Sequence, residues 1–269
     1  AEAAFNVRIV TRARSKGISP TSSGRAVLQR IDDLLERYDD MMTDVSTLQS
    51  GNSGTLTIGY NAPIAPAFLP AITQQLRAEH TGVNLVFVDG DNTFVQQGLR
   101  DGQFDAILFV EELPSPQIET KPLCFSPTYC LCPADHPIAQ GAQVTVAQIR
   151  REPLVLLDRP AARTYYLDLL EQDGNASQIV ATANSTEMVR SLVAVGTGIS
   201  LLSMRPGDLP AYSKGDVRCI PVEGMKHGVT LSIGFAPGPK RRLVEAFIDL
   251  CTAFFASEAH EEFIVRRAS

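Results

Sequence analysis

The sequence lacks apolar runs long enough to cross a membrane, and it lacks the short motifs of common catalytic sites. A transmembrane helix needs about 18 consecutive apolar residues, and no segment of the 269 residues reaches that length. The Gly-x-Ser-x-Gly elbow, the phosphate loop, His-Glu-x-x-His and Cys-x-x-Cys are all absent. We therefore expect no membrane partner, no cofactor and no catalytic residues, although a site assembled only in space stays open.

Histidine and cysteine are few and scattered. The four histidines lie far apart along the chain, and the five cysteines are odd in number. Cysteines in apolar contexts fit reduced cytosolic thiols better than a disulfide framework. No basic-then-apolar leader opens the sequence, so we expect a cytoplasmic protein. The Cys-x-Cys of Cys130 and Cys132 predicts two buried small residues on one strand face rather than a metal site.

Charge is unevenly spread along a chain of net charge −6. Residues 1–30 hold six basic residues against Glu2 alone, a net of +5, and residues 31–50 hold Arg37 against six acids, a net of −5. The remaining 219 residues carry −6. A basic head on an acidic body indicates that only the head meets a polyanion. Four cations of the head flank Gly17 in a candidate two-stranded hairpin that suits DNA phosphates, with a solvated loop as the alternative: Arg8, Arg12, Arg14 and Lys16.

A long helix follows, with Thr21 as its N-cap. One apolar row recurs at spacings of three and four, and this pattern predicts a helix of about 28 residues. The row comprises Leu28, Ile31, Leu35, Tyr38, Met42 and Val45. An apolar stripe on so long a helix favours dimerisation over packing on its own domain. Residues 50–54 then read as a hinge.

The chain beyond the hinge is organised around residues 54–61, which read as a buried strand followed by a loop. Strands near 55–60, 83–88 and 104–110 alternate with helices near 66–79 and 92–101, which predicts a parallel α/β sheet. Ligands bind at the carboxyl edge of such sheets. We therefore place one wall of a ligand site at Tyr60, Asn61 and Ala62, and Asn92 at the same edge as a helix cap. The alternative is that these residues only cap helices.

A second α/β region follows Pro122. Its strand near 179–183 leads into Asn184, Ser185 and Thr186, which open a helix running to about Val195. Hydroxyls and free N–H groups at a helix start make a seat for an anion. Later strands near 217–222 and 229–235 precede a helix over 240–255, and the polar tail from Ser257 is expected to fray.

Motifs in this order resemble the LysR-type transcriptional regulators. Residues 5–12 (FNVRIVTR) resemble the L-G-V-x-L-F-x-R pattern that ends the family's winged helix-turn-helix, and residues 18–24 resemble the V-x-L-T-x-A-G that follows. Gly54-x-Leu56-x-Ile58-Gly59 resembles the opening of the family's effector domain. Further matches in order are Phe68-Leu69-Pro70, Gly90, Leu99-x-x-Gly102-x-x-Asp105, Pro122-Leu123, His136-Pro137-Ile138-Ala139 and Val195-Gly196-x-Gly198-Ile199.

The resemblance implies a fold and a division into domains. It implies two Rossmann-like α/β subdomains of the type 2 periplasmic-binding-protein fold, joined by crossover strands near Phe125 and Met225. The expected parts are the end of the winged helix-turn-helix (residues 1–20), the linker helix and hinge (21–53), subdomain I (54–125 and 226–256), subdomain II (126–225) and a tail (257–269). The resemblance also places most of the recognition helix upstream of Ala1.

The function that the resemblance implies is effector-controlled binding of operator DNA by a homodimer or homotetramer. By position, the family's effector-contacting loops fall on Asn61, Ala62, Asn92, Thr128, residues 184–186 and Ile199, and the expected effector is a small organic anion. Two other classes stay open, a periplasmic-type solute-binding protein and an enzyme on the same sheet. A secretion signal would favour the first, and turnover of a ligand would reveal the second.

Overall fold

A computed structural model describes most of the chain, which divides into two compact units, residues 1–55 with 81–84 and residues 56–80 with 85–269. The described residues are 2, 8–13, 17–47, 53–61, 65–110, 117–171, 178–207, 211–224 and 228–265. Three of the predicted functional residues, Arg14, Lys16 and Ala62, lie outside them, as does Met225. The side chains of Arg12, Met42 and Val45 also lie outside the description.

The first unit begins with the predicted hairpin. Strands β1 (Val10–Ala13) and β2 (Gly17–Pro20) pair antiparallel, with Val10 opposite Pro20. Thr21 joins the hairpin to the next helix, because its N–H donates to the Ile9 carbonyl at 2.9 Å and its Oγ1 accepts from the N–H of Gly24 at 2.9 Å. A Cβ at Gly24 would lie 1.8 Å from the Ile9 carbonyl oxygen, so only glycine fits there.

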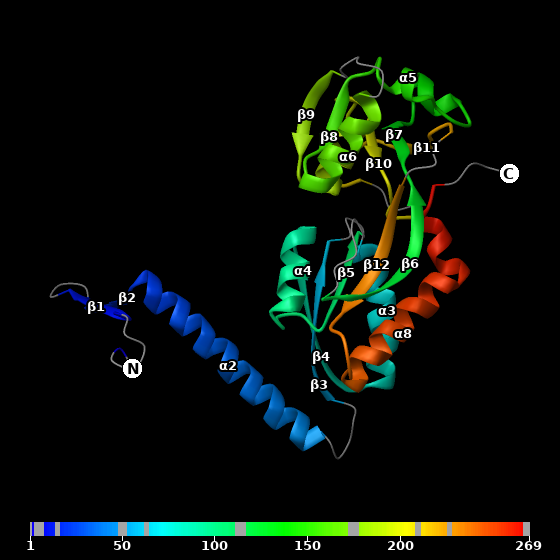
Figure 1. Cartoon of the computed structure of the whole chain (residues 1–269). Coiled ribbons are helices and arrows are strands. Elements are labelled where there is room, and N and C mark those ends of the chain that lie inside the picture. Colours follow the sequence, from blue (N-terminus) through cyan, green and yellow to red (C-terminus); the bar gives the residue numbers. More distant parts are fainter. Residues whose placement is uncertain are drawn as a thin grey trace. The chain divides into compact units, whose positions relative to one another are not determined.

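Helix α2 (Ser22–Thr47) has 26 residues, close to the predicted length (Figure 1). Its described apolar row lies on the surface of the single chain, since Leu28, Ile31, Leu35 and Tyr38 are each between 43% and 53% exposed. Leu34, from a neighbouring row, is also exposed. The apolar stripe that the spacing predicts is therefore present.

Most of a five-stranded mixed sheet in the order β4-β3-β5-β12-β6 belongs to the second unit, and only the first residues of β3 and β4 fall in the first. Its strands are β3 (Ser53–Tyr60), β4 (Gly82–Asp89), β5 (Ala106–Val110), β6 (Glu119–Pro127) and β12 (Gly228–Phe235). Strand β5 pairs parallel with β3, as predicted, and antiparallel with β12, which also pairs antiparallel with β6. The chain thus returns late to this sheet and inserts β12 between β5 and β6.

Helices α3 (Ala65–Glu79), α4 (Asn92–Arg100) and α8 (Arg242–Ala256) pack on this sheet. Figure 1 shows α3 and α8 on one face and α4 on the other. Phe68 of α3 meets Phe255 of α8 edge to face, with ring centroids 5.1 Å apart. Burial of such aromatic side chains contributes most of the stability of an α/β layer.

The other α/β region contains strands β7 (Tyr129–Pro133), β8 (Leu154–Leu157), β9 (Ile179–Ala183), β10 (Ser200–Leu202) and β11 (Val217–Pro221). They form one sheet in the order β10-β7-β11 and a parallel pair β8-β9. Its α-helices are α5 (Val146–Ile149), α6 (Pro160–Glu171) and α7 (Thr186–Ala194), and a 3₁₀ helix spans Pro137–Gln140. Cys130 and Cys132 are fully buried in β7, which confirms their predicted burial.

Two local predictions are wrong. The N-cap of α4 is Asp91, whose Oδ1 accepts from the N–H of Phe94 at 2.8 Å, and Asn92 is the first helical residue. The segment after Ser257 does not fray before residue 265, because it forms a 3₁₀ helix (Glu258–Phe263) and then buries Phe263, Ile264 and Val265. The three anchoring residues are consecutive but stand between polar stretches, so the polar composition of the segment as a whole hid them. Among the described residues, no helix combines the length and apolarity that a membrane span requires.

Candidate functional site

A cavity of about 660 Å³ lies in the second unit, where residues of both α/β regions meet. The α/β region built on the five-stranded sheet lines the cavity with the residue after β3, the start of α4, the end of β5 and the start of β12. The other α/β region lines it with the β8–α6 turn, residues of α6, the start of α7 and the end of β10. The polar lining residues are Asn61, Asp91, Asn92, Thr93, Arg159, Thr164, Tyr165, Tyr166, Asp168, Thr186 and Ser203. The remaining lining residues are mainly apolar.

One wall consists of two asparagines at neighbouring strand ends. Asn61 follows β3, and its own N–H donates to the Leu108 carbonyl of β5 at 2.7 Å. Its Nδ2 donates to Oδ1 of Asn92 at 2.5 Å, while Nδ2 of Asn92 donates to the Val110 carbonyl at 2.8 Å. These bonds fix both amide planes, so the wall is rigid before any ligand arrives.

The opposite wall carries a cation, Arg159, in the turn between β8 and α6. Its Nη2 lies 2.8 Å from the Gly90 carbonyl oxygen and 3.6 Å from Oδ1 of Asp89, both at the end of β4. The side chain of Arg159 is 21% exposed. These contacts join the two α/β regions beside the cavity. Burial, and to a smaller extent Asp89, raises the pKa of the adjacent Tyr60.

A cluster of hydroxyl groups lies on the α6 side. The hydroxyls of Tyr165 and Thr128 are 2.8 Å apart, those of Tyr166 and Ser203 are 3.1 Å apart, and those of Thr128 and Ser203 are 3.4 Å apart. Burial raises the pKa of both tyrosines, so both stay protonated near neutral pH. Tyr165, Tyr166 and Ser203 line the cavity, and Thr128 supports them from behind.

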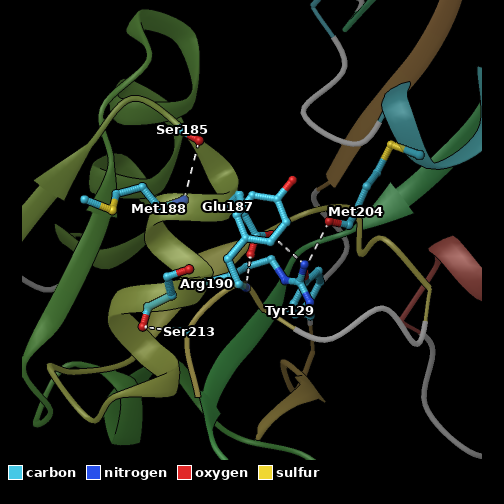
Figure 2. A network of polar contacts seen from close by, with 9 residues as sticks. Tyr129, Ser185, Glu187, Met188, Arg190, Met204 and Ser213 are labelled. Atoms are coloured by element: carbon cyan, nitrogen blue, oxygen red, sulfur yellow. Dashed lines mark hydrogen bonds and ion pairs between the residues drawn. The ribbon is translucent and has the colours of Figure 1, made fainter. Parts of the chain in front are cut away.

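The start of α7 supplies a third polar position. Ser185 caps the helix, with its Oγ accepting from the N–H of Met188 at 3.4 Å (Figure 2). Thr186, the next residue, lines the cavity and is only 8% exposed. Its Oγ1 is a buried hydroxyl oxygen without a hydrogen-bond partner among the described residues. A buried polar atom in this state normally requires a water or a ligand group.

Polar contacts, some of them buried, lie behind this helix start (Figure 2). Arg190 of α7 pairs with Glu187 at 2.7 Å, and Glu187 also accepts from the N–H of Tyr212. The hydroxyl of Tyr129 donates to the carbonyl of Met204, a lining residue, at 3.2 Å. The side chain of Arg190 is only 6% exposed, so its charge is paired with Glu187 rather than left to solvent.

The predicted effector residues fall into different positions. Asn61, Asn92 and Thr186 line the cavity, and Thr128 lies one layer behind it. Ile199 is fully buried and bridges to Leu154 of β8, while Asn184 and Ser185 are exposed. Tyr60 is partly exposed at the end of β3.

Sequence reasoning missed Arg159, Tyr165, Tyr166 and Ser203. Arg159 follows a four-residue apolar strand, so the strand-end rule that selected Asn61 could have selected it as well. The tyrosines of α6 carry no such signal, because their inward direction depends on how the helix packs.

The lining combines hydrogen-bonding groups with an apolar surface. No histidine or cysteine occurs among the cavity residues that the structure describes. In the same part of the chain, no cluster of three or more His, Cys, Asp or Glu side chains could hold a metal ion. One cation, an orphan hydroxyl at a helix start and a set of tyrosine and serine hydroxyls are groups that orient a small polar ligand.

Comparisons with known proteins agree with this arrangement. The family model of the LysR substrate binding domain matches residues 49–256. The Hca operon transcriptional activator HcaR of Escherichia coli (strain K12) is 23% identical over 263 residues, which cover 95% of this chain and 86% of HcaR. The HTH-type transcriptional regulator cbl of Klebsiella aerogenes is 24% identical over 258 residues, or 94% of this chain and 80% of cbl.

Solved structures agree as well. HinK, a LysR family transcriptional regulator from Pseudomonas aeruginosa, superposes with a TM-score of 0.69 at 27% identity, covering 94% of this chain and 85% of HinK. The two α/β regions are thus those of a periplasmic-binding-protein-like fold. With most of its length matched by the family's domain, the chain belongs to the LysR family of transcriptional regulators.

Proposed function

We propose that the protein is a LysR-type regulator that binds operator DNA through its N-terminal region and a small organic anion in the cavity between its two α/β regions. The observation that carries the proposal is the cavity. Its volume of about 660 Å³ lies within the roughly 300–1,000 Å³ typical of small-molecule sites. Its polar groups come from several helix starts and strand ends, as expected for a site that binds a ligand selectively.

Of the residues expected from the sequence, Asn61, Asn92 and Thr186 are carried forward as effector contacts, with Thr128 as their support. The anionic character of the effector is supported by Arg159 and by the start of α7, where free N–H groups favour negative charge. The boundaries expected from the sequence serve as the working domain division.

DNA binding and self-association are supported by the first unit. The β1–β2 hairpin and Arg8, an exposed residue at its foot, suit phosphate contacts. The exposed apolar row of α2, from Leu28 to Tyr38, is suited to a second copy of the helix. We propose a homodimer formed through α2, with a homotetramer as its further assembly.

A ligand experiment tests the effector site. The purified protein is screened by thermal shift against small organic acids, and the hit is titrated by calorimetry into Asn61→Ala. Loss of one hydrogen bond to a charged ligand should weaken affinity about ten- to a hundredfold. Asn84→Ala, an exposed asparagine of β4 away from the cavity, is the control. A hit whose affinity is the same in Asn61→Ala and the wild type would remove Asn61 from the site.

A DNA experiment tests the other half. Mobility shifts with the regulator's own upstream region are measured at two salt concentrations for wild type and Arg8→Ala. Removing a phosphate contact should weaken binding on all sequences alike and reduce the salt slope by about 1. Arg151→Ala, on the effector domain, should bind as wild type. An Arg8→Ala protein with unchanged affinity and slope would contradict the proposed role.

A further inference from the structure

The charges around the cavity are unequal in number and in depth. The described residues of its lining include one cation, Arg159, and two carboxylates, Asp91 and Asp168. Both acids belong to exposed residues, and the Asp91 carboxylate already caps α4. Arg159 is the more buried of the charged groups, with a side chain 21% exposed. A ligand that enters would therefore find one positive position inside and negative positions at the rim.

The guanidinium of Arg159 keeps free donor capacity. Its contacts with the Gly90 carbonyl and with Asp89 both use Nη2, and these are its polar contacts within the described part of the chain. Nε and Nη1 remain for a ligand. A guanidinium can present two parallel N–H groups to one carboxylate, which gives both charge and geometric selection.

A neutral donor and an apolar surface complete the site. The Thr186 hydroxyl is buried and unpartnered at the start of the nine-residue helix α7. Most of the other lining is hydrocarbon or aromatic, including Leu157, Tyr165, Leu202 and Val229. Such a surface stabilises an apolar ligand body by about 25 cal/mol per Å² of area removed from water, whereas a fully polar ligand would lose its hydration there without replacement.

We infer that the cavity selects a monocarboxylate with a flat or aliphatic apolar body, and that Arg159 is the specificity-determining residue for its charge. The inference rests on the proposed function and narrows its effector class. Among the lining residues that the structure describes, a second negative charge would find no second cation and would face Asp91 or Asp168. Dicarboxylates and phosphate esters are therefore disfavoured, and so are neutral amides, which leave the guanidinium without an anion.

The test compares ligands that differ only in charge. Benzoate, 2-naphthoate and octanoate are each titrated beside the matching amide, and naphthalene-2,6-dicarboxylate supplies the dianion, with melting temperature and calorimetry as readouts. At least one acid should bind about tenfold or more tightly than its amide. The dicarboxylate should bind more weakly than 2-naphthoate.

Variants identify the residue responsible. Arg159→Gln should remove the preference for acid over amide, Arg159→Lys should restore part of it, and Thr186→Val should weaken the acid without abolishing the preference. Arg163→Gln is the matched control, because Arg163 lies on α6 four residues after Arg159, pairs with Asp158 at 3.1 Å and does not line the cavity. Melting temperatures without ligand show that each variant folds.

The outcomes separate this inference from the proposed function. A preference for acid that is lost in Arg159→Gln and kept in Arg163→Gln supports the inference. If the neutral amides or the dicarboxylate bind with the same affinity as the monoacids, the inference is overturned. The cavity would still bind a ligand, so the proposed function would stand. A preference that survives in Arg159→Gln, or no binding by any of the acids, also overturns the inference.

Discussion

Asn61 and Asn92 are joined by a hydrogen bond from Nδ2 of Asn61 to Oδ1 of Asn92, 2.5 Å long. The bond ties the end of β3 to the first residue of α4. Asn92 also donates to the Val110 carbonyl at the end of β5, so one buried amide holds two strand ends and a helix start together. The two residues therefore shape the cavity wall whether or not a ligand is bound.

Asn92→Ala should destabilise the fold. It leaves the Asn61 amide and the Val110 carbonyl without their partner, and each buried polar group without a hydrogen bond costs about 1–3 kcal/mol. Urea denaturation followed by circular dichroism would measure the loss in free energy of unfolding. The exposed control Asn84→Ala should change that free energy by less than about 0.5 kcal/mol. Equal stability of the two variants would show that the amide bonds contribute nothing net.

Leu35→Glu should dissociate the proposed dimer without unfolding the α/β body. The substitution places a charge in the exposed apolar row of α2, where an interface with a second copy would bury it at high cost. Light scattering measures the mass, and circular dichroism measures the fold. Gln29→Glu, on the opposite side of α2, should keep the mass of the wild type. A Leu35→Glu protein of unchanged mass, or one that has lost its whole fold, would argue against the seam.

Phe263→Ala should cost about 3–5 kcal/mol, the range for truncating a buried aromatic side chain. The ring is 3% exposed and lies 6.0 Å from that of Phe68 and 6.3 Å from that of Phe254, centroid to centroid. Thermal unfolding would detect a fall in melting temperature of several degrees. Glu258→Ala, an exposed substitution in the same 3₁₀ helix, should have little effect. A small effect at Phe263 would mean that the segment after Ser257 frays after all.

Stability should fall at alkaline pH because of the buried thiols. Burial, with a smaller contribution from Cys219, raises the pKa of Cys132 from 9.0 to about 11. The folded protein therefore keeps a proton that the unfolded chain has lost, so this contribution is complete below pH 9 and is lost as the pH rises to about 11. Its slope is at most about 1.4 kcal/mol per pH unit. Unfolding measured across this range should show a shallower slope in Cys132→Ala than in Cys124→Ala, and identical slopes would contradict the shift.

Local pattern was enough for much of the fold. The three-and-four spacing from Leu28 predicted α2, and the strand patterns predicted β3, β4 and β5 to within a few residues. It was insufficient where neighbouring residues compete for one role. Asp91 and Asn92 are both good caps, and only the backbone geometry at the start of α4 decided between them. Polar composition predicted fraying after Ser257. That prediction is wrong because Phe263, Ile264 and Val265 are buried although their neighbours in the sequence are polar.

The candidate site was only partly predictable for a related reason. Strand ends and helix starts can be read from a sequence, and these rules led to Asn61, Asn92 and Thr186. Arg159, Tyr165 and Ser203 line the same cavity only because distant segments of the chain pack together. Asn61 and Ser203, for example, are more than a hundred residues apart in the sequence. Ile199, expected near a ligand, is fully buried and forms an isolated parallel bridge with Leu154 of β8; its contact with an effector stays a prediction.

The sequence by itself determined the family, the α/β class, the long helix with its apolar row and the edge of the sheet where a ligand site would form. These follow from periodicity, capping residues and ordered motifs, all of which act over short distances along the chain. The tertiary structure alone decided which side chains share the cavity. Only it shows that Arg159 is the one cation among the described lining residues and that the Thr186 hydroxyl has no hydrogen-bond partner among them. Charge balance and polar satisfaction depend on contacts between distant segments, and such contacts exist only once the two α/β regions have packed together.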